Sequence, residues 1–132
     1  MKVLNAHHIS INVKNLEETL NFYENILGFK KLEFVQLETA ELYYYLIPGT
    51  NTKLELITYD YEVGEAKDSH LVKGAARHFC FEVDDIKDAE QVMKKAGVKF
   101  NSDIVPIDEI KCYSLLVEDP NGFELELVEP YK

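Results

Sequence analysis

Two histidines and two glutamates occupy matching places in the two halves of this 132-residue chain. His8 lies in the stretch AHHISINV and His78 in the similar stretch ARHFCFEV. Further along each half, Glu55 and Glu126 each lie between two leucines. Two neutral imidazoles and two carboxylates form a set of ligands suited to a divalent metal ion. The sequence therefore predicts a metal site made of His8, Glu55, His78 and Glu126.

Each of the four residues has a simpler explanation when it is taken alone. A histidine on a strand is more often a half-buried, hydrogen-bonded residue than a ligand, and a glutamate between leucines usually faces solvent. Recurrence in both halves favours the metal site, because unrelated glutamates have no reason to fall at matching positions. Carboxylates crowded together without a cation would also repel each other and take up protons.

The elements that must position these residues follow from the hydrophobic pattern. Alternation around His8 places Ser10 and Asn12 on its side of a strand, and alternation around His78 does the same for Cys80 and Glu82. Asn15 and Glu18 form a capping box, and an apolar stripe of helical spacing follows them. That stripe is predicted to bury Leu16, Leu20, Tyr23, Ile26 and Leu27.

Each half is predicted as a strand, a helix and three more strands. The first half has strands at 6–13, 29–37, 40–47 and 52–59 with a helix at 15–28, and the second has strands at 77–83, 98–104, 110–118 and 123–128 with a helix at 85–97. The predicted fold is α+β: two βαβββ modules from an internal duplication, with curved mixed sheets around a central cup for metal and substrate. Residues 1–132 form one domain, with module one at 5–60, a linker at 61–75 and module two at 76–130.

Other polar residues are weaker candidates. His7 is expected to point away from the face of His8, and His70 falls in the polar linker. Cys80 could place a thiol near the metal, although a small buried filler is the simpler interpretation. Of the consecutive tyrosines 43–45, one is expected to line the cup.

Composition restricts the partners and the compartment. The chain has 14 Lys plus Arg against 24 Asp plus Glu, a formal charge of −10, which argues against nucleic acid and anionic membranes. Two cysteines without a CxxC motif, and no signal-peptide pattern at the start, favour a cytoplasmic protein. Arg77 is the sole arginine, so few guanidinium groups can bind a polyanionic cofactor.

Paired βαβββ modules, the two early histidines, NLEETLNFYENILGF and DPNGFELEL together resemble the vicinal oxygen chelate superfamily, whose best-known member is glyoxalase I. The resemblance covers essentially the whole chain. It implies that His8, Glu55, His78 and Glu126 hold one divalent metal ion per site, with Ni, Zn or Co favoured and Mn or Fe as alternatives. It also implies a homodimer.

The order His, Glu, His, Glu is that of bacterial glyoxalase I, which isomerises a 2-oxoaldehyde–thiol hemithioacetal to a 2-hydroxyacyl thioester, as a lactoylglutathione lyase does. By this resemblance Glu126, with Glu55 as the other candidate, is the catalytic base. The alternatives are a methylmalonyl-CoA epimerase-like or extradiol dioxygenase-like enzyme, or a non-catalytic protein that binds a small molecule. The thiol is left open, because Asn12 stands where glyoxalase I usually has a glutathione-binding arginine.

Overall fold

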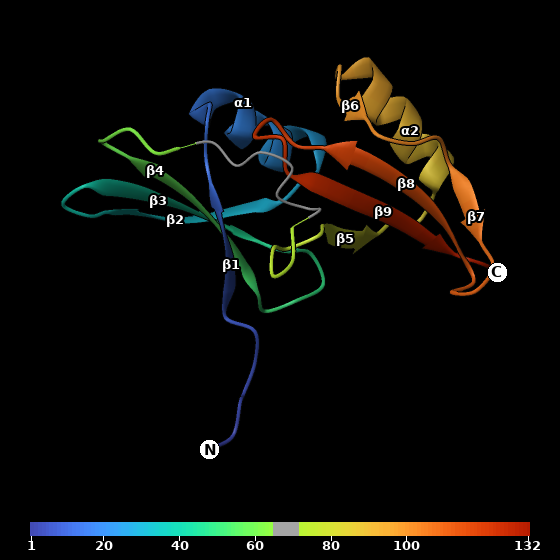
Figure 1. The fold of residues 1–132 in the computed structure, drawn as a ribbon, viewed down its shortest axis with the longest axis horizontal. Coiled ribbons are helices and arrows are strands. Elements are labelled where there is room, and N and C mark those ends of the chain that lie inside the picture. The colour runs from blue at the N-terminus through green and yellow to red at the C-terminus, as the bar shows by residue number, and fades with distance from the viewer. Residues whose placement is uncertain (65–71) are drawn as a thin grey trace. The chain divides into compact units, whose positions relative to one another are not determined.

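The structure is a computed structural model that describes residues 1–64 and 72–132. The chain divides into two compact units, Met1–Gly64 and Glu65–Lys132, and each unit is described by itself (Figure 1). His70, predicted to lie in the linker, falls outside the described residues. The predicted cup depends on how the two modules are placed relative to each other, so it stays a prediction. The predicted module boundaries stay predictions as well.

The first unit is one mixed sheet with a helical segment between its strands β1 and β2 in sequence. Its strands follow the order β1-β4-β3-β2, with β1 parallel to β4 and the other neighbours antiparallel. The helical segment supplies the crossover that a parallel pair needs. The elements are β1 (His8–Asn12), α1 (Leu16–Asn21), η1 (Phe22–Ile26), β2 (Lys30–Gln36), β3 (Ala40–Leu46) and β4 (Lys53–Tyr59).

The helical segment of this unit begins as predicted but changes its winding. The Asn15 side chain accepts a hydrogen bond from the Glu18 backbone N–H at 3.0 Å, which confirms the N-cap. From Phe22 the helix is a π-helix, in which each turn holds more residues than an α-turn. The buried face also differs from the predicted stripe: Thr19, Phe22 and Tyr23 are buried, whereas the other members of the stripe are half-buried.

The second unit repeats this plan with one more strand. Its sheet order is β5-β9-β8-β6, with β5 parallel to β9, and β7 also pairs with β8. Figure 1 shows α2 lying along the β8 and β9 strands, with which it is in contact. The elements are β5 (Phe79–Glu82), α2 (Ile86–Lys95), β6 (Lys99–Phe100), β7 (Val105–Ile107), β8 (Cys112–Glu118) and β9 (Glu124–Pro130).

The single strand predicted at 98–104 is wrong. The structure has the two-residue β6 and then β7, both antiparallel to β8. Between β6 and β7, the Ser102 hydroxyl accepts a hydrogen bond from the Leu116 backbone N–H at 2.9 Å. A side chain therefore takes the place of a backbone carbonyl partner on the neighbouring strand. Polar residues at 101–103 favour this interruption, and Pro106 is tolerated because β7 lies at an edge.

Leucines of the central strands form the core of each unit. In the first unit Leu54 and Leu56 of β4 are fully buried, and in the second Leu115, Leu125 and Leu127 are 0 to 1% exposed. Each such side chain stabilises its unit by about 1.5–3 kcal/mol relative to an exposed one. The alternation predicted for the last strands is thus confirmed, and so is the α+β class, since mixed sheets dominate both units.

Among residues 1–64 and 72–132, no helix is both long and apolar enough to cross a lipid bilayer.

The cap of α2 yields a stability prediction. The Asp85 carboxylate accepts from the backbone N–H groups of Lys87 and Asp88, both at 3.0 Å. Asp85→Ala leaves these donors without their acceptor, so we expect a loss of about 1 kcal/mol in the free energy of unfolding. Urea denaturation measures it. Asp84→Ala is the control, because the adjacent Asp84 is exposed and makes no cap bond; equal effects of both variants would contradict this role.

Candidate metal centre

In the first unit, strand pairing brings His8 and Glu55 together. β1 and β4 run in parallel, with Ser10 opposite Glu55 and His8 two residues earlier on the same face. His8 Nε2 lies 3.7 Å from Glu55 Oε2. The imidazole and the carboxylate therefore approach each other with a gap that is too long for a hydrogen bond.

Glu55 is held in place by hydroxyl groups on both sides. It is only 8% exposed, and Ser10 Oγ donates to its Oε1 at 2.8 Å. Tyr44, opposite Glu55 on β3, donates a short hydrogen bond to Oε2. This bond and partial desolvation raise the pKa of Tyr44 to about 12, so the phenol stays a donor near neutral pH. Both oxygens of Glu55 thus have a hydroxyl partner.

His7 lies next to the other nitrogen of His8, contrary to its predicted place on the opposite face. Nδ1 of His7 is 2.8 Å from Nδ1 of His8, and both residues are exposed. This happens because His7 precedes the first residue of β1, where strand alternation does not yet apply. The Nε2 of His8 is therefore the nitrogen that faces Glu55.

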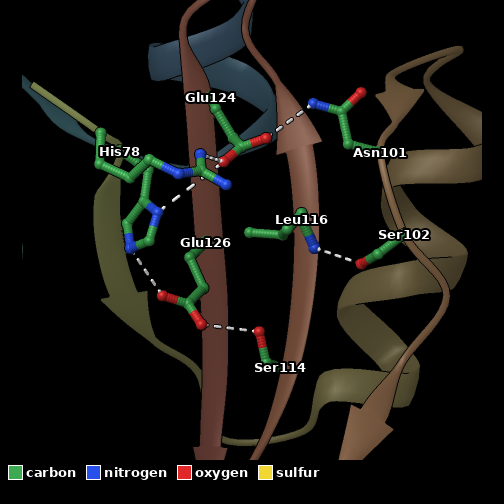
Figure 2. A network of polar contacts seen from close by, with 8 residues as sticks. His78, Asn101, Ser102, Ser114, Leu116, Glu124 and Glu126 are labelled. Carbon is green, nitrogen blue, oxygen red and sulfur yellow. Dashed lines mark hydrogen bonds and ion pairs between the residues drawn. The ribbon is translucent and has the colours of Figure 1, made fainter. Parts of the chain in front are cut away.

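In the second unit, the same construction brings His78 and Glu126 together (Figure 2). His78 Nε2 lies 2.9 Å from Glu126 Oε2, and Ser114 Oγ donates to Glu126 Oε1 at 2.7 Å. As in the first unit, Nε2 is the ring nitrogen that faces the carboxylate. Each unit thus brings one predicted histidine ligand close to one predicted glutamate ligand.

Cys80 contacts Glu126 from the neighbouring strand, as its register opposite Glu126 requires. The predicted buried filler is wrong, because the residue is exposed. Partial desolvation, followed by the negative charge of Glu126, raises the pKa of the Cys80 thiol to about 11. The thiol therefore stays protonated at neutral pH.

A second buried carboxylate, Glu124, lies near the other nitrogen of His78. Glu124 is 7% exposed, and its Oε1 lies 3.8 Å from His78 Nδ1. Arg77 forms a close ion pair with the same oxygen, and Asn101 Nδ2 donates to Oε2 at 3.0 Å. Figure 2 shows these groups converging on Glu124 above the Glu126 pair.

The donor chemistry of the two pairs fits a divalent metal ion. Each offers one imidazole Nε2 and one carboxylate oxygen on adjacent strands, and such ligands suit Ni, Zn, Co, Mn or Fe. Within the described residues, no group of three or more His, Cys, Asp and Glu side chains is close enough to hold an ion. One pair alone is an incomplete site, so a four-ligand set needs both pairs and stays a prediction.

The three consecutive tyrosines have separate roles. Tyr45 is fully buried and donates to Glu24 Oε2 at 3.0 Å, which ties η1 to the sheet. Tyr43 donates to Glu41 at 2.5 Å. Only Tyr44 contacts a predicted ligand, so it is the tyrosine that fits the predicted lining role.

Several residues around the ligands were missed from sequence alone: Tyr44 as a partner of Glu55, and Ser114, Asn101 and Glu124 around His78 and Glu126. Ser10 and Tyr44 face Glu55 directly across the strands, so correct strand pairing would have found them. Ser114 reaches Glu126 diagonally, since its own partner is Val128. Asn101 follows β6, the strand that was predicted with wrong bounds.

A groove in the second unit does not involve these residues. It has a volume of about 400 Å³ and lies at the start of α2, lined by residues that include Asp84, Tyr113 and Glu129. Glu129 already accepts from the Ile86 N–H at 2.8 Å. The groove therefore offers acidic groups rather than the predicted ligands.

The sequence matches known enzymes over most of its length. Lactoylglutathione lyase of Salmonella typhimurium is 28% identical over 127 residues, covering 92% of this chain and 90% of that protein. The probable chloroplastic lactoylglutathione lyase of Arabidopsis thaliana is 26% identical over 92% of this chain, which spans only 35% of that relative's length. Mitochondrial methylmalonyl-CoA epimerase of Homo sapiens is 32% identical over 76% of this chain and 58% of that protein.

The fold also matches solved structures. A glyoxalase family protein from Bacillus cereus aligns with a TM-score of 0.83 and 18% identity, covering 100% of this chain and 97% of that one. Residues 5–127 match the family model described as the Glyoxalase/Bleomycin resistance protein/Dioxygenase superfamily. Since that match covers nearly the whole chain, the protein belongs to this superfamily, as its motifs and duplicated pattern predicted.

Proposed function

We propose that this protein is a divalent-metal-dependent enzyme of glyoxalase I type. One observation carries the proposal: in each unit the Nε2 of a histidine at the start of the first strand, His8 in β1 and His78 directly before β5, faces the carboxylate of a glutamate on the last strand. The distance is 3.7 Å for His8 and Glu55 and 2.9 Å for His78 and Glu126. Relatives named lactoylglutathione lyase support the same reaction class.

The metal is held by His8, Glu55, His78 and Glu126, with Ni, Zn or Co favoured and Mn or Fe as alternatives. It supplies Lewis-acid stabilisation of the negative charge that develops on the substrate oxygens. The ligand pairs come from one chain or from two subunits of a homodimer, which we propose as the working assembly. We also propose that the enzyme is cytoplasmic.

The reaction moves one proton between adjacent carbons. The substrate is a hemithioacetal of a 2-oxoaldehyde and a thiol, and the product is the isomeric 2-hydroxyacyl thioester. Glu126 removes the proton from the carbon that bears sulfur and delivers it to the neighbouring carbon, and the hydroxyl proton passes from the oxygen of the first carbon to that of the second, so the base is restored after each turnover. Glu55 remains the second candidate for this role.

The hydrogen bonds of the two carboxylates favour Glu126 as the base. Both oxygens of Glu55 accept from hydroxyl groups, those of Ser10 and Tyr44, which hold the carboxylate in place. Glu126 accepts from one hydroxyl, that of Ser114, on Oε1. The Oε2 atom of Glu126 faces His78 Nε2. With Nε2 bound to the metal, this oxygen would be free to accept the substrate proton.

The charges near the candidate site bear on which thiol forms the hemithioacetal substrate. Arg77, the sole arginine, is engaged by Glu124 in an ion pair, and Asn12 offers no positive charge. A thiol with fewer carboxylates than glutathione therefore suits the chain. The identity to methylmalonyl-CoA epimerase makes proton transfer next to a thioester the second candidate function. An extradiol dioxygenase-like reaction, or binding of a small molecule without turnover, is a further alternative that the reaction test below addresses.

Metal removal tests the site. We expect the wild-type protein to retain stoichiometric Ni, Co or Zn after reconstitution and dialysis, and His8→Ala and Glu126→Ala to lose it, because each removes one ligand. Elemental analysis by mass spectrometry measures the bound metal.

Glu118→Gln is the matched control, because Glu118 lies on β8 and pairs with Lys99 rather than with a histidine. It should bind metal like the wild-type protein. Retention of full metal by both ligand variants would rule out the proposed ligands.

Substitution of the two glutamates tests the base. With methylglyoxal and a panel of thiols, Glu126→Gln should lower kcat by about 10²- to 10⁴-fold, as expected when a general base is removed. Glu55→Gln should chiefly weaken metal binding, and excess metal should restore part of its activity. Product formation is followed by absorbance of the thioester.

Equal kcat losses in both variants at saturating metal would contradict this division of roles. If the metal-loaded wild-type protein is inactive with every thiol, epimerisation of a methylmalonyl thioester is assayed by deuterium exchange at the carbon between the carboxylate and the thioester carbonyl. Exchange there would favour the second candidate function. Its absence as well would favour ring cleavage or a binding protein.

A further inference from the structure

His78 has a buried ring nitrogen whose role the proposed site does not explain. Its Nδ1 is inaccessible to solvent and has no hydrogen-bond partner within residues 72–132 or 1–64. An unpaired buried polar atom is costly and rare in a folded protein. His8 differs, because its Nδ1 lies 2.8 Å from His7.

Glu124 is the acceptor that lies near this nitrogen. Its Oε1 is 3.8 Å from His78 Nδ1, slightly beyond hydrogen-bond distance. The carboxylate cannot easily turn away, because Arg77 pairs with Oε1 and Asn101 donates to Oε2 at 3.0 Å. Glu124 is also 7% exposed, so solvent does not substitute for these partners.

The position of the imidazole proton connects these observations. A hydrogen bond across the 2.9 Å between His78 Nε2 and Glu126 Oε2 places the proton of a neutral ring on Nε2, and Nδ1 is then an unpaired acceptor. A metal on Nε2 displaces that proton, so the neutral ring must carry its proton on Nδ1. A donor at Nδ1 then faces the fixed carboxylate of Glu124.

We propose that Glu124, anchored by Arg77 and Asn101, is a positioning residue that accepts the Nδ1 proton of His78 and so orients Nε2 toward the metal. Carboxylates commonly serve histidine ligands in this way, by fixing the tautomer and the orientation of the ring. The inference rests on the proposed metal site. The unpaired Nδ1 of His78 is the atom that this role of Glu124 would explain.

Nitrogen NMR tests the tautomer directly. Protein labelled with ¹⁵N-histidine has four imidazoles, and a His78→Gln variant identifies the signals of His78. At a fixed pH well above the ordinary histidine pKa, we expect an Nε2–H tautomer without metal and an Nδ1–H tautomer after addition of zinc. An Nε2–H tautomer in the zinc-loaded wild-type protein would overturn the proposal, and this measurement needs no Glu124 variant.

Zinc affinity tests the contribution of Glu124. Glu124→Gln keeps the size of the side chain but removes its charge, and we expect zinc binding to weaken by about 10- to 100-fold, the usual effect of losing an outer-shell partner. Competition with a chromophoric chelator measures the affinity. Glu118→Gln is again the control, since Glu118 is opposite Glu124 in the sheet and also pairs with a cation, Lys99.

The outcomes separate this inference from the proposed function. Zinc binding that depends on His78 but is equally strong in Glu124→Gln, Glu118→Gln and the wild-type protein would overturn only the positioning role. Absence of zinc binding by the wild-type protein would overturn the metal site and this inference together. Thermal unfolding of each variant without metal identifies a loss of affinity that comes from misfolding.

Discussion

The parallel pairing of the first strand with the last strand in each unit is the interaction on which the candidate site depends. β1 pairs with β4 and β5 with β9, while the helix and two or more other strands form the connection. Each histidine belongs to the start of a unit and each glutamate to its end. Adjacent strands bring them within 4 Å although most of the unit separates them in sequence.

Buried carboxylates impose the next constraint. Glu55 and Glu124 are less than one-tenth exposed, and a carboxylate taken out of water needs donors or cations to remain charged. Ser10 and Tyr44 meet this need for Glu55, and Arg77 and Asn101 meet it for Glu124. The polar residues around the proposed ligands are therefore part of what makes the site stable without a metal.

The two units share a plan but differ in the partners of their ligands. Glu55 has hydroxyl donors on both oxygens, whereas Glu126 has one hydroxyl donor and lies beside the Cys80 thiol. This difference gives the proposed reaction one firmly held ligand and one carboxylate that is freer to move a proton. Duplication explains the matching positions, and later divergence of neighbouring residues explains the unequal environments.

Much of the fold follows from local sequence. Strand alternation around His8 and His78, the buried leucines beside Glu55 and Glu126, and the cap at Asn15 depend on residues close in sequence, so the pattern alone predicted them. The local pattern gave wrong predictions where tertiary contacts or a side-chain hydrogen bond replaced the expected regular structure. The helix buries Thr19 and Phe22 rather than the whole predicted stripe, and the Ser102 side chain interrupts a predicted strand.

The sequence by itself determined the α+β class, the duplicated plan and the four candidate ligands, since residue type and spacing carry that information. Only the tertiary structure decided that Tyr44 reaches Glu55, that Ser114 reaches Glu126 and that Glu124 approaches the buried nitrogen of His78. These contacts depend on strand register and on side-chain directions across strands. Register is set by the packing of distant segments, and no local pattern encodes it.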